Sequence, residues 1–486
     1  MSTRRNAAKS GIWSAVLQLS RFGLNTIFFL ILARWLTLAE IGAFAAAFAP
    51  IRVLQIVQRS GFSEAIIQGD TDDSVFVTTC FWMALGFGFL ASALLIVFSF
   101  FVGSLTNADE AGAFLLAMSA MPIMIAAASV PEGLLRRRFE VRSLAIRTTV
   151  SITLAGPVAL WLGYRGYGGW ALTVFALMNT ALSTVLVLAM AKWRPKGRPR
   201  LEAARAILPI VGAISGREFA YSSISPIYQL MVAAALGPVA AGAFQIAQRF
   251  VMLAQTLTTT ALRFATLPIL VKLRDSETRL GAALLETSGL LTLVSAPVYF
   301  GLLSVAPQLL PLAVGVDNGL TTVPILQSML FIGATISIHT LYTQALTATG
   351  RSDVALRWAI VSLLLYVPVG ALAAQHSAAL TALAQSALGF LTLPFVVVGM
   401  SRRFGLSAPA LFRSAFAPVL SAALMMIILF AFNRYFNDYL GPLSMVLWQT
   451  LVGALVYLGL AVAFCREQLR TLTSLLISLR PSADAL

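Results

Sequence analysis

The stretch "WSAVLQLSRFGLNTIFFLILARW", residues 13–35, decides the fold class of this chain. It is long and apolar enough to cross a hydrocarbon layer of about 30 Å as a helix. Comparable runs recur along all 486 residues, of which 59% are hydrophobic and only 11% charged. The mean hydropathy of +0.86 is far above that of a soluble domain. The sequence therefore predicts an all-α polytopic membrane protein without a separate soluble domain.

Turn and charge signals divide the apolar runs into fourteen expected membrane spans. We expect six spans in an N-terminal lobe, a basic cytoplasmic linker, six spans in a C-terminal lobe, two additional spans and an amphipathic cytoplasmic tail. The corresponding boundaries are 1–191, 192–205, 206–400, 401–464 and 465–486. The expected spans are 11–33, 41–60, 74–102, 111–131, 143–163, 168–191, 206–236, 240–265, 281–304, 321–345, 354–374, 379–400, 408–432 and 443–464.

The loops between these spans differ strongly in charge. One set holds "LLRRRFEVR", "KWRPKGRPR", "VKLRDSETR", "GRSDVALR" and "SRRFG", whereas the other holds only Arg34, Arg165 and Arg434. Cytoplasmic loops collect Lys and Arg, so both termini are expected in the cytoplasm. This rule also explains the net charge of +15 without a nucleic-acid partner, which would need a basic soluble face.

A weak internal repeat relates the two expected lobes. "LTLAEIGAF" at 36–44 aligns with "LGPVAAGAF" at 236–244, and each joins the first two spans of its lobe. Many secondary transporters are built from such repeats, with the substrate site between the halves. The sequence therefore predicts two pseudo-symmetric six-helix lobes around a central cavity.

Four arginines lie near the middle of spans, on the first two spans of each lobe: Arg21, Arg52, Arg217 and Arg249. Each would cost about 2.5–3.5 kcal/mol in lipid, so we expect them to face a polar interior. Neighbouring polar residues complete the predicted substrate-binding cavity, namely Gln18, Asn25, Gln55, Tyr221, Gln245 and Gln248. A guanidinium group matches phosphate oxygens, which favours an anionic ligand. The alternative is that helix carbonyls or Glu218 satisfy the arginines, without a substrate role.

Glu218 is the one acidic residue placed well inside an expected span. It is either a structural counter-ion to Arg21 or Arg249, or a protonatable coupling site. Pro226, in "YSSISPIY", is the expected hinge, because proline removes a helix hydrogen bond. Cys80 and Cys465 lack metal-ligand spacing, so no metal site is expected.

Several motifs resemble a known family: "GIWSAVLQLSRFG", "ILARWLTLAEIGAFAAA", "GFSEAIIQ", "LLRRRFEVRSLAI" and "GYGGWAL". They are similar to the Wzx-type polysaccharide flippases of the multidrug/oligosaccharidyl-lipid/polysaccharide exporter superfamily, most clearly over residues 10–200. The resemblance implies two six-helix lobes, often with two further C-terminal helices, around a central cavity. In this family, cavity arginines on the leading helices are thought to engage the diphosphate or acidic sugars, and Arg21, Arg52, Arg217 and Arg249 occupy such places.

The implied activity is the transfer of undecaprenyl-diphosphate-linked oligosaccharide units from the cytoplasmic to the outer leaflet of a bacterial inner membrane, for exopolysaccharide, lipopolysaccharide O-antigen or capsule synthesis. A polymerase and a chain-length regulator are the implied partners, beside membrane lipids. No cofactor is expected, and without a phosphate-binding GxxxxGK[ST] loop the energy would come from protons, another ion or the membrane potential. A peptidoglycan-precursor flippase and then a multidrug exporter of the same superfamily are the alternatives. An enzyme is not expected, because the outward loops hold no catalytic constellation.

Overall fold

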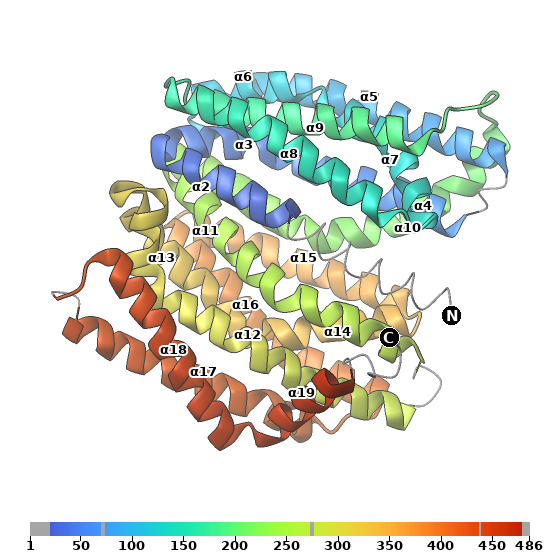
Figure 1. Cartoon of the computed structure of the whole chain (residues 1–486). Helices are drawn as coiled ribbons and strands as arrows, with labels where there is room; N and C mark the ends of the chain where they lie inside the picture. Colours follow the sequence, from blue (N-terminus) through green and yellow to red (C-terminus); the bar gives the residue numbers. More distant parts are fainter. Residues whose placement is uncertain (1–19, 70–72, 273–276, 437–438, 479–486) are drawn as a thin grey trace, which may run out of the picture. The chain divides into compact units, whose positions relative to one another are not determined.

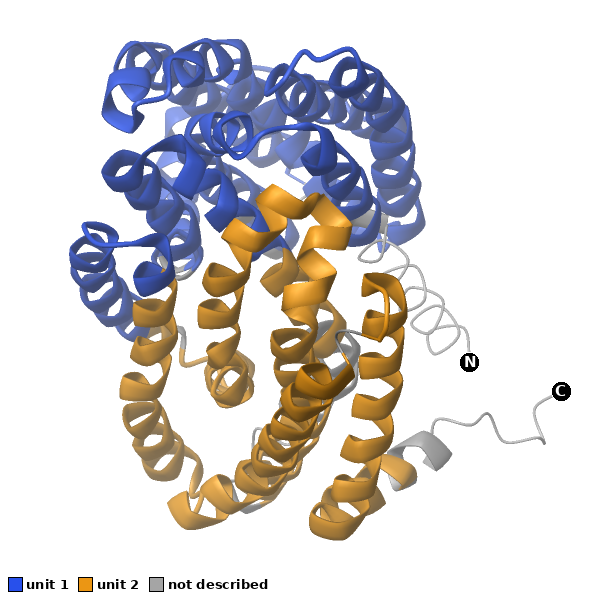
Figure 2. Ribbon diagram, turned by 90° about the vertical axis from the view of Figure 1, so that its left-hand side faces the viewer, with its two compact units in different colours: residues 1–249, 356–381 blue, residues 250–355, 382–486 orange. Residues whose placement is uncertain are grey.

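The computed structural model describes residues 20–69, 73–272, 277–436 and 439–478, and every regular element in these ranges is a helix (Figure 1). The chain divides into two compact units, coloured separately in Figure 2. Unit 1 comprises Met1–Arg249 and Leu356–Thr381, and unit 2 comprises Phe250–Ala355 and Ala382–Leu486. The predicted lobe boundaries stay a prediction, because these units follow contact density rather than the internal repeat.

The described part of unit 1 starts with a π-helical turn, η1 (Ser20–Leu24), and contains a second one, η2 (Val57–Phe62). Its other elements are α2 (Asn25–Trp35), α3 (Leu38–Ile56), α4 (Ser63–Gln68), α5 (Ser74–Thr106), α6 (Asp109–Met118), α7 (Met121–Arg137), α8 (Val141–Tyr164), α9 (Trp170–Ala191), α10 (Leu201–Ser222), the first part of α11 (Ile224–Lys272) and most of α15 (Ser352–Ala374).

Unit 2 holds the rest of α11 and the remaining helices. These are α12 (Glu277–Val314), α13 (Val316–Leu330), the short 3-10 helix η3 (Phe331–Ala334), α14 (Ile336–Ala348), α16 (Ala378–Phe404), α17 (Ala408–Phe436), α18 (Pro442–Phe464) and α19 (Arg466–Ser478). The amphipathic α19 packs Leu469 and Leu472 against a core formed by α12, α17 and α18.

The predicted fold class is confirmed, but the count of fourteen spans is not. Among the described residues, eleven helices are long and apolar enough to cross a membrane, or twelve if α13 and α14 form one span bent by 54°. Two features account for the difference. The first expected span is described only as the shorter apolar helix Phe22–Trp35, and Ile224–Thr258 counts once although Gly237, with φ 79°, interrupts its helical geometry.

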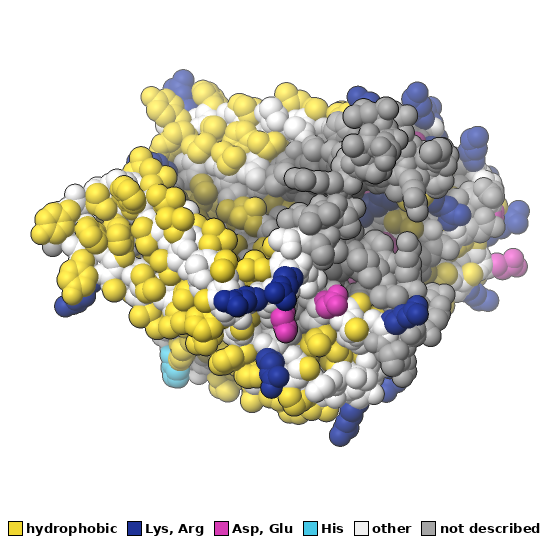
Figure 3. Space-filling model, turned by 60° about the horizontal axis from the view of Figure 1, so that its bottom comes forward, with side chains coloured by type: hydrophobic (Ala, Val, Ile, Leu, Met, Phe, Trp, Pro, Cys, Tyr) yellow, Lys and Arg dark blue, Asp and Glu magenta, His cyan; other side chains and the backbone are white. Residues whose placement is uncertain are grey.

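Hydrophobic side chains cover broad areas of the surface, as expected for contact with lipid. Figure 3 shows extended hydrophobic areas on one face, beside Lys and Arg side chains. The exposed faces of single helices agree: on α18, for example, Leu447, Leu451, Leu455 and Leu458 are each at least half exposed. In water such surfaces would drive aggregation, whereas in a bilayer they are the outer wall of the protein.

The two repeat segments meet in the structure at a pair of glycines. A methyl group on Gly42 would overlap the backbone carbonyl of Pro238, and one on Gly242 would overlap that of Leu38. Each added methyl group would also lie within 3.1 Å of the backbone nitrogen of the other glycine. Small residues allow such backbone contact between membrane helices. The two copies of the sequence repeat therefore contact each other reciprocally, one at the start of α3 and the other in the middle of α11.

The start of α3 is fixed by local chemistry beside this contact. Thr37 accepts a hydrogen bond from the Glu40 backbone, and the Glu40 carboxylate accepts one from the Thr37 backbone at 2.8 Å. This reciprocal capping box satisfies amide groups that a helix start leaves unpaired. Gly168 and Gly169, from the "GYGGW" motif, have no room for a side chain, because a methyl group would overlap the Glu40 side chain at Gly168 and the Phe114 ring at Gly169. Several motif residues therefore serve to hold the N-terminus of α3 in place.

Replacing Gly42 with alanine is expected to lower the free energy of unfolding by about 1–3 kcal/mol, because the added methyl group must push α3 and α11 apart. Gly86→Ala is the matched control, since Gly86 is also helical and has no atom within 4 Å of an added methyl group. Thermal unfolding of both variants in detergent measures the difference. Equal stability of the two variants would contradict the close contact.

Candidate functional site

Unit 1 contains a polar cavity of about 730 Å³, within the size range typical of ligand sites. Its walls come from α2, α3, η2, α4, α7, α8, α9, α10 and α11. The charged lining residues are Arg52, Arg59, Glu64, Glu132, Arg136, Arg147 and Glu218. Serine, threonine and asparagine side chains fill much of the space between them. The cavity can therefore solvate a polar or anionic group inside an otherwise apolar unit.

Five of the residues singled out from the sequence line this cavity. They are Asn25, Arg52, Gln55, Glu218 and Pro226. They come from three separate parts of the chain, on α2, α3 and the region where α10 gives way to α11. The structure thus brings them to one place, while their roles in binding stay a prediction.

Three other predicted residues lie in the same unit but do not line the cavity. The guanidinium carbon of Arg249 lies 4.6 Å from the centre of the Phe29 ring, an arrangement that stabilises a cation. Arg249 also lies close enough to Arg52 to feel its charge. Gln245 and Gln248 are buried, and Gln248 donates a hydrogen bond to the Ser225 carbonyl at 3.3 Å. In this conformation the two glutamines stabilise the packing of α11.

The remaining predicted site residues fall outside what the structure describes. Gln18 precedes the first described residue, and the side chains of Arg21, Arg217 and Tyr221 are not among the described ones. Their places in the cavity stay predictions from the sequence.

The helix is interrupted close to Pro226. α10 ends at Ser222 and α11 begins at Ile224, with Ser223 between them. Proline cannot donate a backbone hydrogen bond to the carbonyl four residues earlier, which here is that of Ser222. The helix therefore breaks at the residues where Pro226 removes a backbone hydrogen bond. Pro226 itself lines the cavity. Whether this point moves as a hinge stays a prediction.

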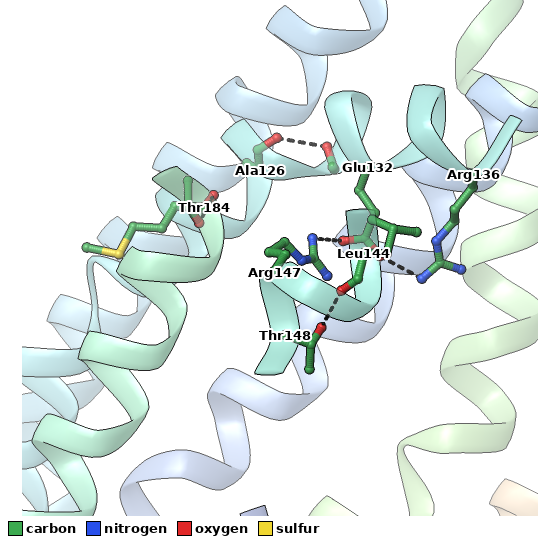
Figure 4. A network of polar contacts seen from close by, with 9 residues as sticks. Ala126, Glu132, Arg136, Leu144, Arg147, Thr148 and Thr184 are labelled. Carbon is green, nitrogen blue, oxygen red and sulfur yellow. Dashed lines mark hydrogen bonds and ion pairs between the residues drawn. The ribbon is translucent and has the colours of Figure 1, made fainter. Parts of the chain in front are cut away.

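The sequence reasoning missed an ionic network toward the C-terminal end of α7. Glu132 accepts hydrogen bonds from Arg136 at 2.6 Å and from Arg147 of α8 at 3.0 Å, so it lies between the two arginines (Figure 4). Its side chain is only 15% exposed and that of Arg147 only 12%, whereas Arg136 is 47% exposed. The spacing of Glu132 and Arg136 was a readable signal for a helical pair. The expected span ends at residue 131, six residues before α7 itself ends, so it does not include this pair.

This network changes the expected charge balance. With Glu218 as the single mid-span acid, the sequence leaves most of the positive charge without a protein counter-ion. The described cavity lining instead holds four arginines and three glutamates, so that one positive charge remains. The protein therefore supplies most of the compensation itself.

The described residues contain no group of three or more His, Cys, Asp or Glu side chains that could hold a metal ion. Cys80 and Cys465 are both buried free thiols.

The fold is that of multi-span membrane transporters. It is similar to the lipid II flippase MurJ in an inward closed conformation, with a TM-score of 0.78, 16% identity and coverage of 94% of this chain and 99% of that one. It is less similar to an inward-facing MATE family multidrug transporter of the MOP superfamily, with a TM-score of 0.59, 14% identity and coverage of 85% and 98%.

The chain belongs to the family described as polysaccharide biosynthesis protein, whose model matches residues 31–317. It is 25% identical to the succinoglycan biosynthesis transport protein ExoT of Rhizobium meliloti, over 60% of each chain. It is 21% identical to the lipopolysaccharide biosynthesis protein WzxC of Escherichia coli, over 82% of this chain and 80% of that one. With the teichuronic acid biosynthesis protein TuaB of Bacillus subtilis it shares 24% identity, over 93% and 94%. The resemblance inferred from the motifs is confirmed.

Substituting Glu132 with glutamine is expected to destabilise the protein by about 3 kcal/mol, because it leaves the buried Arg147 without its charged partner. The matched control is Arg136→Gln, which removes the exposed partner of the same glutamate and should cost less than about 1 kcal/mol. Denaturation of the two variants in detergent measures both effects. Similar losses for the two, or no loss for Glu132→Gln, would contradict the importance of the buried pair.

Proposed function

We propose that this protein transfers a lipid-diphosphate-linked oligosaccharide from the cytoplasmic to the outer leaflet of a bacterial inner membrane. The observation that carries the proposal is the arginine-lined cavity inside a unit with an apolar exterior. Such a cavity can hold the charged, sugar-bearing head group, which cannot cross hydrocarbon unaided, while the lipid tail remains in the bilayer. The named relatives act in the biosynthesis of succinoglycan, lipopolysaccharide and teichuronic acid, which supports an oligosaccharide as cargo.

The arginines are suited to the diphosphate. Arg52 and Arg59 line the cavity about two helical turns apart, on α3 and η2, with Gln55 between them. A guanidinium group can donate two parallel hydrogen bonds to phosphate oxygens, so this side of the cavity is where we place the diphosphate. Transport by alternating access would draw on a proton or other ion gradient or on the membrane potential. A polymerase and a chain-length regulator are the partners that would use the transferred unit.

A peptidoglycan-precursor flippase is the second candidate, because its cargo also joins a sugar head group to a lipid diphosphate and because the fold is similar to that of MurJ. A multidrug exporter is less compatible with a cavity that carries excess positive charge, since charge repulsion disfavours cationic drugs. The test below therefore includes both lipid-linked cargoes.

The first test is reconstitution into vesicles with a fluorescent lipid-diphosphate oligosaccharide, measuring its transfer between leaflets. Arg52→Gln is expected to lower the transfer rate at least tenfold, because it removes a charged phosphate donor. Arg52→Lys should keep part of the activity, since it keeps the charge but not the planar fork. Arg165→Gln is the control, because Arg165 is exposed on a loop and stacks on Trp161 away from the cavity.

Wild-type transfer by Arg52→Gln, with the variant as stable as the wild type, would contradict the cavity proposal. Transfer of lipid II in the same vesicles, without transfer of the oligosaccharide lipid, would instead establish the second candidate.

The proposed orientation has structural support in unit 1. Several helix ends gather near the basic segments: Arg137 donates a hydrogen bond to the Ile66 carbonyl at the end of α4, and the backbone of Lys196 bonds the Thr78 side chain near the start of α5. The ends of α4, α7 and α9 and the start of α5 therefore share one side, where Lys and Arg are exposed. The positive-inside rule makes this side cytoplasmic.

Cysteine labelling tests this orientation. Both native cysteines are fully buried, so they should not react with a membrane-impermeant maleimide. Arg198→Cys should be labelled only from the cytoplasmic side and Tyr167→Cys only from the outside, since both positions are exposed at opposite ends of α9. The reversed pattern in right-side-out and inside-out vesicles would overturn the orientation.

A further inference from the structure

The segment between α9 and α10 carries a regular pattern of charge. It reads "KWRPKGRPR" over residues 192–200, and every second residue is basic. These basic residues are all exposed, and no ion pair to any of them occurs among the described residues. They form the basic strip, which comprises Lys192, Arg194, Lys196, Arg198 and Arg200. The strip therefore presents a concentrated positive charge at the surface of unit 1.

The backbone of the basic strip is held in a fixed course. The charge alone would need no ligand, because cytoplasmic loops collect Lys and Arg. However, the Thr78 hydroxyl donates a hydrogen bond to the Lys196 carbonyl at 2.9 Å and accepts one from the Lys196 amide at 3.2 Å. The Thr79 hydroxyl accepts a hydrogen bond from the Arg200 amide at 3.2 Å. Both threonines belong to α5 and are only 1% exposed, so the strip is tied to a buried part of that helix.

Trp193 gives the strip a third point of attachment. Its ring meets the Phe81 ring of α5 edge to face, with 5.5 Å between the ring centroids and 64° between the planes. It also packs against a buried cluster that includes Leu135 of α7, Leu144 of α8 and Val187 of α9. The backbone that carries the charges is thus ordered before a ligand arrives. Binding therefore costs little further backbone entropy.

The neighbouring apolar side chains place the strip at the edge of the bilayer. On α5, Trp82 is 45% exposed and lies three or four residues beyond the two threonines, about 4.5–6 Å along the helix. Tryptophan is enriched where hydrocarbon meets the lipid head groups. On α10, directly after the strip, Leu201 and Leu208 lie seven residues apart on one helical face and are 68% and 62% exposed. The basic strip therefore lies at the depth of the lipid phosphates.

This position favours a lipid over a protein as the ligand of the strip. Basic residues next to a membrane helix are attracted to anionic phospholipids, which raises the affinity by about fivefold for each Lys or Arg. Nine extended residues reach at most about 32 Å, enough to lie beside several head groups. An acidic protein bound to the strip would also have to cover Trp82, Leu201 and Leu208, whose exposed apolar surfaces suit hydrocarbon.

We propose that the basic strip binds the phosphate groups of anionic phospholipids, such as phosphatidylglycerol, at the surface of the bilayer. These lipids are neighbours of the protein and not its cargo, so the inference is independent of the proposed function. Arg194, Lys196 and Arg198 form the centre of the site. Thr78 and Thr79 are positioning residues, because they hold the backbone from which the charges project.

Lipid titration of the full-length protein in a neutral detergent tests the proposal. Short-chain phosphatidylglycerol and phosphatidylcholine of the same chain length are added separately, and the bound lipids are counted by native mass spectrometry. Wild-type protein is expected to bind phosphatidylglycerol at least tenfold more tightly than phosphatidylcholine. The triple variant Arg194→Gln, Lys196→Gln and Arg198→Gln should lose at least tenfold in affinity for phosphatidylglycerol, with little change for phosphatidylcholine.

A matched control separates the strip from the net charge of the protein. A second triple variant removes the same charge from three different helices of unit 2, and its affinity for phosphatidylglycerol should stay within twofold of the wild type. The exposed arginines that it replaces are changed as Arg279→Gln, Arg402→Gln and Arg413→Gln.

A positioning variant keeps every charge but releases the backbone. The double variant Thr78→Val and Thr79→Val removes the hydroxyls that hold the strip and preserves their volume. At wild-type thermal stability it should lose about threefold in affinity for phosphatidylglycerol. An unchanged affinity would contradict the positioning role of the two threonines.

Two outcomes overturn the lipid site itself. Equal affinity of the wild-type protein for the two lipids would mean that the strip does not select an anionic head group, and an acidic protein would become the partner to seek. Equal losses in the two triple variants would mean that net charge, and not the ordered strip, attracts the lipid. Neither outcome bears on the transfer of the oligosaccharide lipid.

Discussion

The arrangement of unit 1 depends on the contact between Gly42 and Gly242, where two helix backbones meet with no side chain between them. Membrane helices gain little from burying apolar surface, because lipid is as apolar as the protein interior, so close van der Waals contact must hold them together. Arg52 and Arg249 follow these glycines by ten and seven residues, about 15 and 10 Å along a helix. The crossing point therefore determines where the two arginines lie. Their mutual repulsion is offset in part by the Phe29 ring beneath Arg249.

Bringing arginines together inside a membrane requires compensation. Four arginines line the cavity, and an arginine left uncompensated at the middle of a span costs about 2.5–3.5 kcal/mol. The carboxylates of the lining, above all Glu132 between Arg136 and Arg147, remove most of this cost. They are therefore as necessary to the cavity as the arginines themselves.

The sequence allowed some of these features to be predicted and concealed others. Hydropathy locates helices such as α5 and α18, because a span must be apolar over its whole length. An arginine such as Arg52 stands out for the same reason, since charge is rare within a span. Glu132 did not stand out, because it lies near a helix end where charge is common. Its partner Arg147 is on the next helix, and pairing between helices depends on packing that periodicity does not reveal. The π-helical turn at η2 and the break at Gly237 are also local departures that apolar periodicity averages away.

The small net positive charge of the cavity suits a transporter better than a large positive charge would. A transported group must bind well enough to enter the site and weakly enough to leave it. Four unopposed guanidinium groups in a low-dielectric cavity would hold a diphosphate too tightly, since each charged hydrogen bond there is stronger than in water. With Glu64, Glu132 and Glu218 in the lining, an incoming anion must compete with carboxylates that are already present. In the proposed function, the same glutamates that make the arginines tolerable in the membrane would limit how tightly the arginines hold a substrate. Release of the substrate would then cost less, because each arginine can pair with a glutamate again.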